Sequence, residues 1–177
     1  MPTITKKTKT AKRTTLKAPL KKSTSLEVGS RAPSFALPAT KIGKASSAAL
    51  KGKAYILYFY PKDDTSGCTA EACAFRDALP NFSKLGIAVI GVSKDSIVSH
   101  EKFSKKYQLS FPLISDEDGV LCEKYGVWKK KSMYGRSYMG IERSTFLIDG
   151  KGVIRALWRK VNVPGHAEEV KKAIAEL

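Results

Sequence analysis

Residues 54–92, AYILYFYPKDDTSGCTAEACAFRDALPNFSKLGIAVIGV, alternate apolar and helix-favouring segments. The first apolar run, Ala54 to Tyr60, ends at Pro61, and a second run extends from Ile87 to Val92. Short apolar runs bounded by turn signals are typical of strands buried on both faces of a sheet. The segment between them, Cys68 to Leu85, is rich in Ala, Glu, Leu and Arg, which favour helices. These patterns predict a strand, a helix and a second strand.

The chain downstream continues the alternation. Asp95 is expected to cap a helix that extends through about Tyr107. Segments 144–148 and 153–158 flank the turn Asp149-Gly150-Lys151-Gly152 and predict a hairpin. Apolar residues recur at helical spacing over residues 167–177 and predict a closing helix. Together they predict an α/β fold with a central mixed β-sheet flanked by helices, an order of elements found in thioredoxin-like folds.

Composition and charge divide the chain of 177 residues into two parts. Hydrophobic residues make up 42%, and no stretch approaches the roughly eighteen apolar residues of a membrane span, so we expect a soluble globular protein without membrane contact. Residues 1–25 carry eight basic residues and no acidic one, which is half of the net charge of +16. They contain few large apolar groups and are predicted to form a basic disordered arm. The folded domain is expected over residues 26–177.

The basic arm allows several interpretations. It has no apolar h-region, which argues against a secretory signal, and its excess of Lys over Arg is unlike a mitochondrial transit peptide. The pairs Lys6-Lys7 and Lys12-Arg13 would suit nuclear import or a weak contact with DNA or another polyanion. A solvated tail without a specific partner is the alternative. Cytoplasmic location is expected, with nuclear location as the alternative.

Two cysteines, Cys68 and Cys73, carry the clearest chemical signal. Cys68 falls in the first turn of the predicted helix, where free backbone N–H groups and the positive end of the helix dipole favour a thiolate. Five residues along a helix rise about 7.5 Å, beyond the roughly 6.8 Å limit for Cα atoms joined by a disulfide. A disulfide between these cysteines therefore requires the helix to unwind. Two unrelated cysteines on one helix remain the alternative, with Cys73 a small buried apolar residue.

Other thiol and metal chemistries fit less well. The three cysteines and two histidines lack the paired spacing of a zinc site, so no metal is expected. A thiol hydrolase would need a histidine base, but His100 and His166 are expected at the surface or as helix caps. A thioredoxin-type oxidoreductase would place two residues, not four, between its cysteines.

Residues 58–69, YFYPKDDTSGCT, and the following Glu71-Ala72-Cys73 closely resemble the active-site segment of peroxiredoxins of the bacterioferritin comigratory protein or peroxiredoxin Q type. A second segment, residues 138–149, YMGIERSTFLID, resembles the strand that brings in the active-site Arg of that family, here Arg143. A third, residues 163–167, is similar to the lead into its closing helix. The resemblance covers roughly residues 26–177 and leaves out the basic arm.

The resemblance implies a thiol peroxidase that reduces hydrogen peroxide and organic hydroperoxides, in antioxidant defence. Cys68 would attack the peroxide and become a sulfenic acid, and Cys73 would resolve it as a disulfide. Arg143 would stabilise negative charge, Thr65 would orient thiolate and peroxide, and Pro61 would shield the sulfur. Thioredoxin or a similar dithiol would reduce the disulfide. No cofactor is implied, and a monomer is expected.

Two positions depart from the family pattern. Ser66 stands where the subfamily usually has Pro, which predicts a less stiff loop and easier unwinding. Cys122 lies where the family places no catalytic cysteine and is expected to be structural. Two other functions stay open as hypotheses: a thiol–disulfide oxidoreductase that uses the same cysteine pair, and a DNA-binding protein whose affinity depends on residues 1–25 and on salt.

Overall fold

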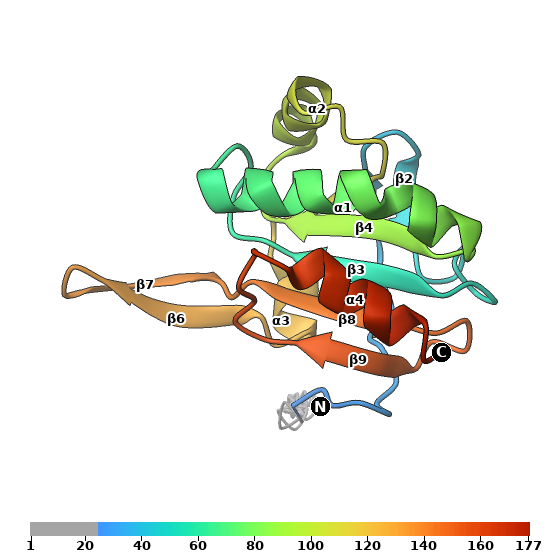
Figure 1. Cartoon of the computed structure of the whole chain (residues 1–177). Coiled ribbons are helices and arrows are strands. Elements are labelled where there is room, and N and C mark those ends of the chain that lie inside the picture. The colour runs from blue at the N-terminus through green and yellow to red at the C-terminus, as the bar shows by residue number, and fades with distance from the viewer. Residues whose placement is uncertain (1–24) are drawn as a thin grey trace, which may run out of the picture.

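The computed structural model describes residues 25–177, which form one seven-stranded mixed sheet, a separate two-stranded ribbon and four helices (Figure 1). The sheet order is β2-β1-β5-β4-β3-β8-β9. The strands are β1 Ala36–Ala39, β2 Gly43–Ser46, β3 Tyr55–Phe59, β4 Ala88–Ser93, β5 Leu113–Ser115, β6 Trp128–Met133, β7 Arg136–Ile141, β8 Ser144–Ile148 and β9 Ile154–Trp158. The helices are α1 Ser66–Lys84, α2 Ile97–Lys106, α3 Val120–Lys124 and α4 His166–Ile174. Within the described range, no helix is long and apolar enough to cross a bilayer.

The predicted strand–helix–strand unit forms the middle of the sheet. β3 pairs in parallel with β4, from Tyr55 opposite Ala88 to Phe59 opposite Val92, and antiparallel with β8 on its other side. Every residue of β3 is buried, as its continuous apolar sequence predicted. The helix begins at Ser66, two residues before the predicted start, so Cys68 lies in its first turn as expected.

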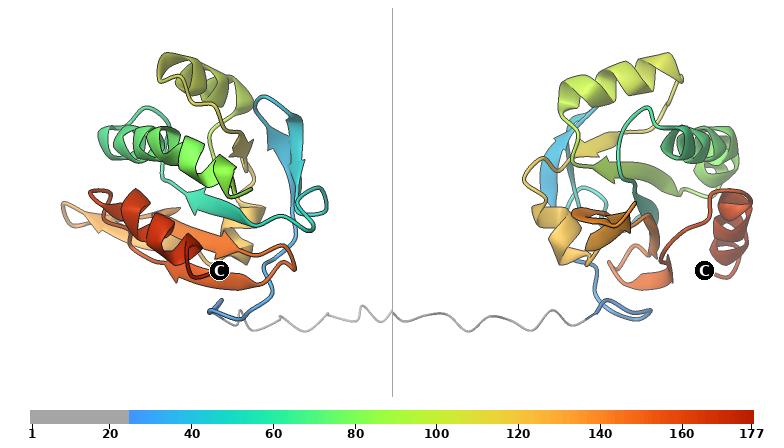
Figure 2. Two further views of the ribbon diagram at one scale, coloured as in Figure 1. Left: turned by 45° about the vertical axis from the view of Figure 1, so that its right-hand side comes forward. Right: turned by 90° about the vertical axis from the view of Figure 1, so that its left-hand side faces the viewer.

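The sheet separates two apolar cores. Alternate β3 side chains enter each core: Leu57 and Phe59 pack with α3 and the β1–β2 hairpin, and Ile56 and Tyr58 pack with the helices α1, α2 and α4. Figure 2 shows α1 and α4 side by side on one face of the sheet and α3 on the other. Cys68 belongs to the core beneath α1, whereas Cys122 belongs to the opposite core.

The predicted hairpin after residue 143 is confirmed, with β8 and β9 antiparallel and a register irregularity at Leu147–Ile148. The α/β thioredoxin-like fold with a mixed central sheet is also confirmed. Elements that the sequence patterns did not indicate are β1, β2, β5, α3 and the ribbon β6–β7, which projects from the body of the molecule in Figure 1. The predicted arm, residues 1–25, lies outside the described residues apart from Ser25.

The start of α2 differs from the prediction. Its N-cap is Ser96, whose hydroxyl accepts a hydrogen bond from the Ser99 N–H at 3.3 Å. Asp95 instead turns its carboxylate toward the loop that follows β3, where Oδ2 accepts from the Asp63 N–H at 2.9 Å and from the Ser93 hydroxyl at 2.6 Å. The predicted cap at Asp95 was therefore wrong by one residue, because its carboxylate has partners in another segment.

Candidate active site

Cys68 is the third residue of α1, the helix that follows the carboxyl end of β3 in the chain. The segment from Pro61 to Gly67, called the Pro61–Gly67 loop below, connects the strand to the helix, and its last two residues are the first two of α1. The cysteine is only 1% exposed. Its thiol is thus removed from bulk water, and the free N–H groups and positive dipole end of a helix N-terminus surround it. The helix N-terminus favours a nucleophilic thiolate at this position, whereas burial by itself opposes a charge, so a nearby cation is needed.

Arg143 brings a positive charge to the Cys68 sulfur. It sits in the two-residue break between β7 and β8, and its Nη2 lies 3.3 Å from Cys68 Sγ. Its Nη1 donates to Oε2 of Glu71, one turn further along α1. Although burial opposes it, the charges of Glu71 and Cys68 hold the pKa of Arg143 above its ordinary value. The structure therefore joins residues 75 positions apart into one contact between a cation and a sulfur.

Gly67 allows this contact. A side-chain Cβ at this position would lie 3.2 Å from Arg143 Nη2, closer than ordinary van der Waals contact. The absence of a side chain lets the guanidinium approach the first turn of α1. Gly67 thus has a steric role in the site that the sequence pattern did not reveal.

Glu71 has a larger part than a favourable acid in the first turns of a helix. Its side chain is 1% exposed and its second oxygen, Oε1, has no hydrogen-bond partner among the described residues. Burial raises the pKa of Glu71 to about 7, although the contact with Arg143 lowers it. The carboxylate orients the Arg143 guanidinium through Nη1, while Nη2 contacts the sulfur.

Thr65 and Pro61 lie in the loop before α1, and both are exposed. Thr65 is the N-cap residue, but its hydroxyl makes no capping bond and donates to the Lys62 carbonyl at 3.1 Å. Its backbone carbonyl accepts the first helical bond, from Thr69 N–H at 2.8 Å. Among the described residues, the Thr65 hydroxyl is therefore bonded within the loop and not to the Cys68 sulfur.

Cys73 lies one and a half turns further along α1 and is half-buried, less enclosed than the apolar default would place it. The three cysteines are all free thiols in this structure. With α1 intact over both positions, Cys68 and Cys73 stay about 7.5 Å apart along the helix axis. Cys122 is fully buried in the other core, and burial together with Asp116 raises the pKa of its thiol strongly.

The expectation of surface positions for the two histidines was wrong. His100 is 0% exposed and His166 is 2% exposed. His166 does open α4, but its Nε2 is bonded to Thr145 Oγ1 at 2.8 Å beneath the helix. Burial lowers the pKa of His166, against the effect of Glu169. Neither histidine is bonded to Cys68, so the thiol-hydrolase arrangement is absent from the described residues.

Lys131 is a second cation on the Cys68 side of the molecule. It is half-buried in the otherwise exposed strand β6, and its Cδ would lie 3.2 Å from a Cβ placed on Gly140. Burial and then the positive charge of Arg143 lower the pKa of Lys131, while Cys68 opposes the shift. No motif singled it out, because three consecutive lysines resemble a solvated run.

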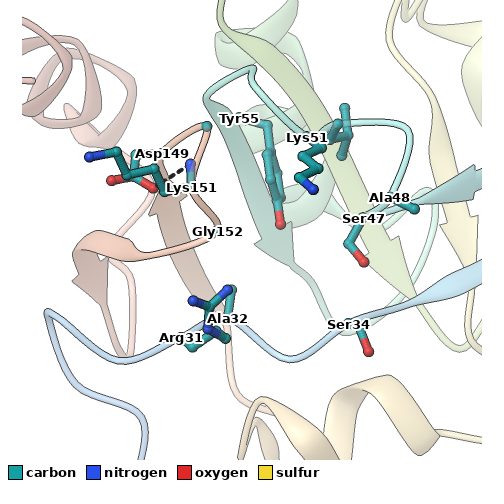
Figure 3. Close-up of a pocket in the computed structure, with 12 residues that line it drawn as sticks. Arg31, Ala32, Ser34, Ser47, Ala48, Lys51, Tyr55, Asp149, Lys151 and Gly152 are labelled. Atoms are coloured by element: carbon teal, nitrogen blue, oxygen red, sulfur yellow. Dashed lines mark hydrogen bonds between the residues drawn. The ribbon is translucent and has the colours of Figure 1, made fainter.

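A cluster of Asp and His side chains and a surface hollow are two other features that resemble ligand sites. Asp63, Asp95 and His100 each place one ligand atom within 4.8 Å of the others, but these atoms are already hydrogen-bonded within the protein, so the cluster does not indicate a metal. A hollow of about 260 Å³ lies at the opposite end of β3 from Cys68, where Tyr55 and the turn at Asp149 border it (Figure 3). Nothing there connects it to the thiol.

Known proteins are similar to this chain in sequence and in structure. Residues 28–157 match the AhpC/TSA family. A Coxiella burnetii relative is 56% identical over 146 residues, which are 82% of this chain and 97% of the relative. Peroxiredoxin Bcp of Bacillus subtilis is 45% identical over 86% of this chain and 97% of its own length. Peroxiredoxin Q of Xanthomonas campestris superposes with a TM-score of 0.77 at 44% identity, over 80% of this chain and 90% of that chain.

Proposed function

The chain belongs to the AhpC/TSA family as a peroxiredoxin of the Bcp/PrxQ type, a thiol peroxidase that reduces hydroperoxides, and from this premise we propose that Cys68 is the sulfur that attacks the peroxide. One observation carries the assignment: the buried Cys68 Sγ lies 3.3 Å from Arg143 Nη2 at the N-terminus of α1. The positive charge favours the thiolate, and the exclusion of water strengthens its effect.

The first step transfers one oxygen atom to the sulfur. The Cys68 thiolate attacks the terminal peroxide oxygen, the O–O bond breaks, and the leaving alkoxide or hydroxide takes up a proton to become an alcohol or water. The sulfur is oxidised to a sulfenic acid. Arg143 is placed to stabilise the negative charge that moves from sulfur to the leaving oxygen. Glu71 holds the guanidinium through an ion pair. Pro61 and Thr65 lie in the loop that leads into α1.

The second step forms a disulfide between Cys68 and Cys73. The Cys73 sulfur attacks the sulfenic sulfur and water leaves, which balances the reaction. The first turns of α1 must unwind, because the two Cα atoms are too far apart on an intact helix. The half-buried position of Cys73 supports the proposal, since a limited unwinding would free both thiols.

An external dithiol must restore the enzyme. Thioredoxin or a similar protein would attack the disulfide and release both thiols. The half-buried position of Cys73 supports this step, because its sulfur is partly accessible to a protein partner. A cytoplasmic location agrees with the three free thiols, which persist in reducing compartments. We propose a monomer there. The eight cations within residues 1–25 would add a weak, salt-dependent contact to a polyanion.

Rapid mixing of the reduced protein with hydrogen peroxide tests the assignment. Wild type should form a Cys68–Cys73 disulfide that thioredoxin reduces. Cys68→Ser should consume no peroxide, and Cys73→Ser should stop at a sulfenic acid that dimedone traps. Cys122→Ser is the matched control and should behave as wild type, because this thiol lies in the opposite core. Normal turnover of Cys73→Ser with thioredoxin would show that another thiol resolves the sulfenic acid.

A further inference from the structure

We propose that Asp63 and His100 are a pair of positioning residues that hold the Pro61–Gly67 loop in the conformation needed for peroxide attack, and whose release accompanies disulfide formation. The inference rests on the proposed function of Cys68 and Cys73. The Asp63 carboxylate lies in the loop, five residues before Cys68, and the His100 ring lies on α2. Nδ1 and Asp63 Oδ2 are 2.8 Å apart, with both side chains almost completely buried.

The hydrogen bonds of His100 give it a fixed place. Its second ring nitrogen, Nε2, lies 3.0 Å from the carbonyl oxygen of Ile114 in β5. Nδ1 faces the Asp63 carboxylate and Nε2 faces the Ile114 carbonyl, so the ring connects the loop to the sheet through two buried hydrogen bonds. Such a buried pair is costly to break, because each partner left alone is a buried polar group without its hydrogen-bond partner.

The Asp63 side chain has two further partners. Tyr60 donates to Oδ1 at 2.6 Å and Ser99 donates to Oδ2 at 2.8 Å. Its backbone N–H donates to Asp95 Oδ2 at 2.9 Å. The residue is thus bonded through both its backbone and its side chain to β3, α2 and the end of β4. No other residue of the Pro61–Gly67 loop has as many partners among the described residues.

Contacts to α2 also border the segment that must unwind. Asp64 adopts the left-handed φ of 56° that few non-glycine residues take, and its carboxylate accepts from Lys106 Nζ at 2.7 Å and from the Tyr107 hydroxyl at 2.5 Å. Beyond Cys73, Arg76 Nη1 donates to the Tyr107 carbonyl at 2.7 Å. The Cys68–Cys73 segment is therefore held to α2 on both sides, and the buried Asp63–His100 pair is the contact furthest from water.

This arrangement predicts opposite effects on the two steps. Peroxide attack needs the folded loop, which keeps Cys68 beside Arg143. Disulfide formation needs the unwound helix. Loss of the pair should slow the first step by about tenfold, since a displacement of about 1 Å in an active site costs as much or more. It should also accelerate the second step, because the folded loop competes with the unwound one.

The test separates the two steps by rapid quenching, thiol alkylation and mass measurement of the full-length protein. The variants are His100→Leu, Asp63→Ala and the double variant, with Glu101→Gln on the exposed side of α2 as the matched control. Each single variant should oxidise Cys68 about tenfold more slowly and form the disulfide at least about twofold faster than wild type. The double variant should lie closer to wild type than either single one, because neither buried side chain is left without its partner.

Parallel slowing of both steps, or an unchanged rate of Cys68 oxidation in the single variants, would overturn the inference. Ser99→Ala keeps the test decisive if a buried variant does not fold, because it removes only one hydrogen bond to Asp63. It should move both rates in the same directions by a smaller factor. Wild type separates the two proposals: failure of Cys68 to oxidise there would contradict the proposed function, whereas the rate pattern of the variants concerns the Asp63–His100 pair.

Discussion

Glu71 shares the charge of Arg143 with Cys68. The guanidinium donates to Glu71 Oε2 through one nitrogen and contacts the sulfur through another, so the carboxylate both orients the cation and competes for it. A fully ionised Glu71 would offset more of the positive charge at the sulfur than a partly protonated one. Burial, which raises the pKa of Glu71 to about 7, therefore keeps more of the Arg143 charge available to the sulfur.

The raised pKa of Glu71 predicts a pH dependence of stability. In the unfolded chain the carboxyl ionises near its ordinary pKa of 4.5, whereas in the folded protein it keeps its proton up to about pH 7. The folded state binds more protons between these values, so stability falls as the pH rises through them. Urea unfolding should show that wild type loses about 3 kcal/mol relative to Glu71→Gln between pH 4.5 and 8.

The exposed carboxylate of Glu123 provides the control for that measurement. Glu123→Gln should keep the pH dependence of wild type, because this side chain is exposed and lies away from the buried contact of Glu71 with Arg143. A constant difference between wild type and Glu71→Gln over the whole pH range would contradict the protonation of Glu71 in the folded protein.

Arg143→Lys tests whether a positive charge is enough at the site. A lysine keeps the charge but has one nitrogen, which cannot reach both Cys68 Sγ and Glu71 Oε2 as the planar guanidinium does. We expect the second-order rate constant with hydrogen peroxide to fall by about a hundredfold in stopped-flow measurements. Arg136→Lys, in the exposed ribbon, should leave that rate unchanged. An Arg143→Lys rate within about twofold of wild type would mean that the charge is sufficient.

At the site, the sequence pattern predicted local features better than distant contacts. The first-turn position of Cys68 could be predicted, and the segment that holds Arg143 was singled out by its motif, while the roles of both residues stay predictions. Glu71 and His100 were assigned surface or helix-favouring roles, since their partners lie 72 and 37 positions away. A residue type without its partner does not indicate whether it is buried, because only the fold brings the partner close.

The start of α1 determines how readily the helix unwinds. Thr65 precedes the helix with φ −91° and ψ 156°, an extended conformation that a following proline accepts. Ser66 is the first helical residue, whose N–H has no partner within the helix, so a proline there removes no helical bond. Ser66→Pro should raise the free energy of unfolding by about 0.4–1 kcal/mol, through the unfolded chain.

The same substitution should slow the formation of the Cys68–Cys73 disulfide by about two- to fivefold, because it disfavours the unwound segment by the same free energy. Oxidation of Cys68 itself should keep its rate. Both steps can be followed by rapid quenching, with Ser66→Ala as the control without a ring. Faster disulfide formation in Ser66→Pro would show that the first turn of α1 does not limit unwinding.

The longer buried strands left apolar runs in the sequence, whereas the short buried strand β5 and the exposed ribbon left no clear pattern. β3, β4 and β8 are buried on both faces, and their apolar runs predicted them. The ribbon of β6 and β7 exposes most of its side chains, including Tyr134 at 97%, so it lacks the alternation that marks a half-buried strand. Its strands are specified by pairing with each other, which a single-strand pattern does not reveal.

Over the whole molecule, charge and chemistry occupy different regions. Residues 1–25 hold half of the net charge, and the ribbon adds a second group of exposed cations. These cations are Lys129, Lys130 and Arg136. The thiol chemistry depends on a few side chains at the N-terminus of α1 and in the break before β8. Residues 1–24 can therefore be removed without removing Cys68, Glu71 or Arg143.

Removal of residues 1–24 tests whether the terminal cations bind polyanions. Binding of duplex DNA, measured by fluorescence anisotropy, should weaken as salt is added. The truncated chain should bind more weakly, and its binding should depend less on salt. Each lost phosphate contact reduces the slope of log K against log salt by about 0.9. Peroxide reduction should stay within about twofold of wild type, since Cys68 and its partner Arg143 both belong to residues 25–177. The matched control is a triple variant in which Lys129, Lys130 and Arg136 are replaced by Ala. If truncation left the salt slope unchanged and the triple variant reduced it, the contact would lie on the ribbon and not on the terminal segment.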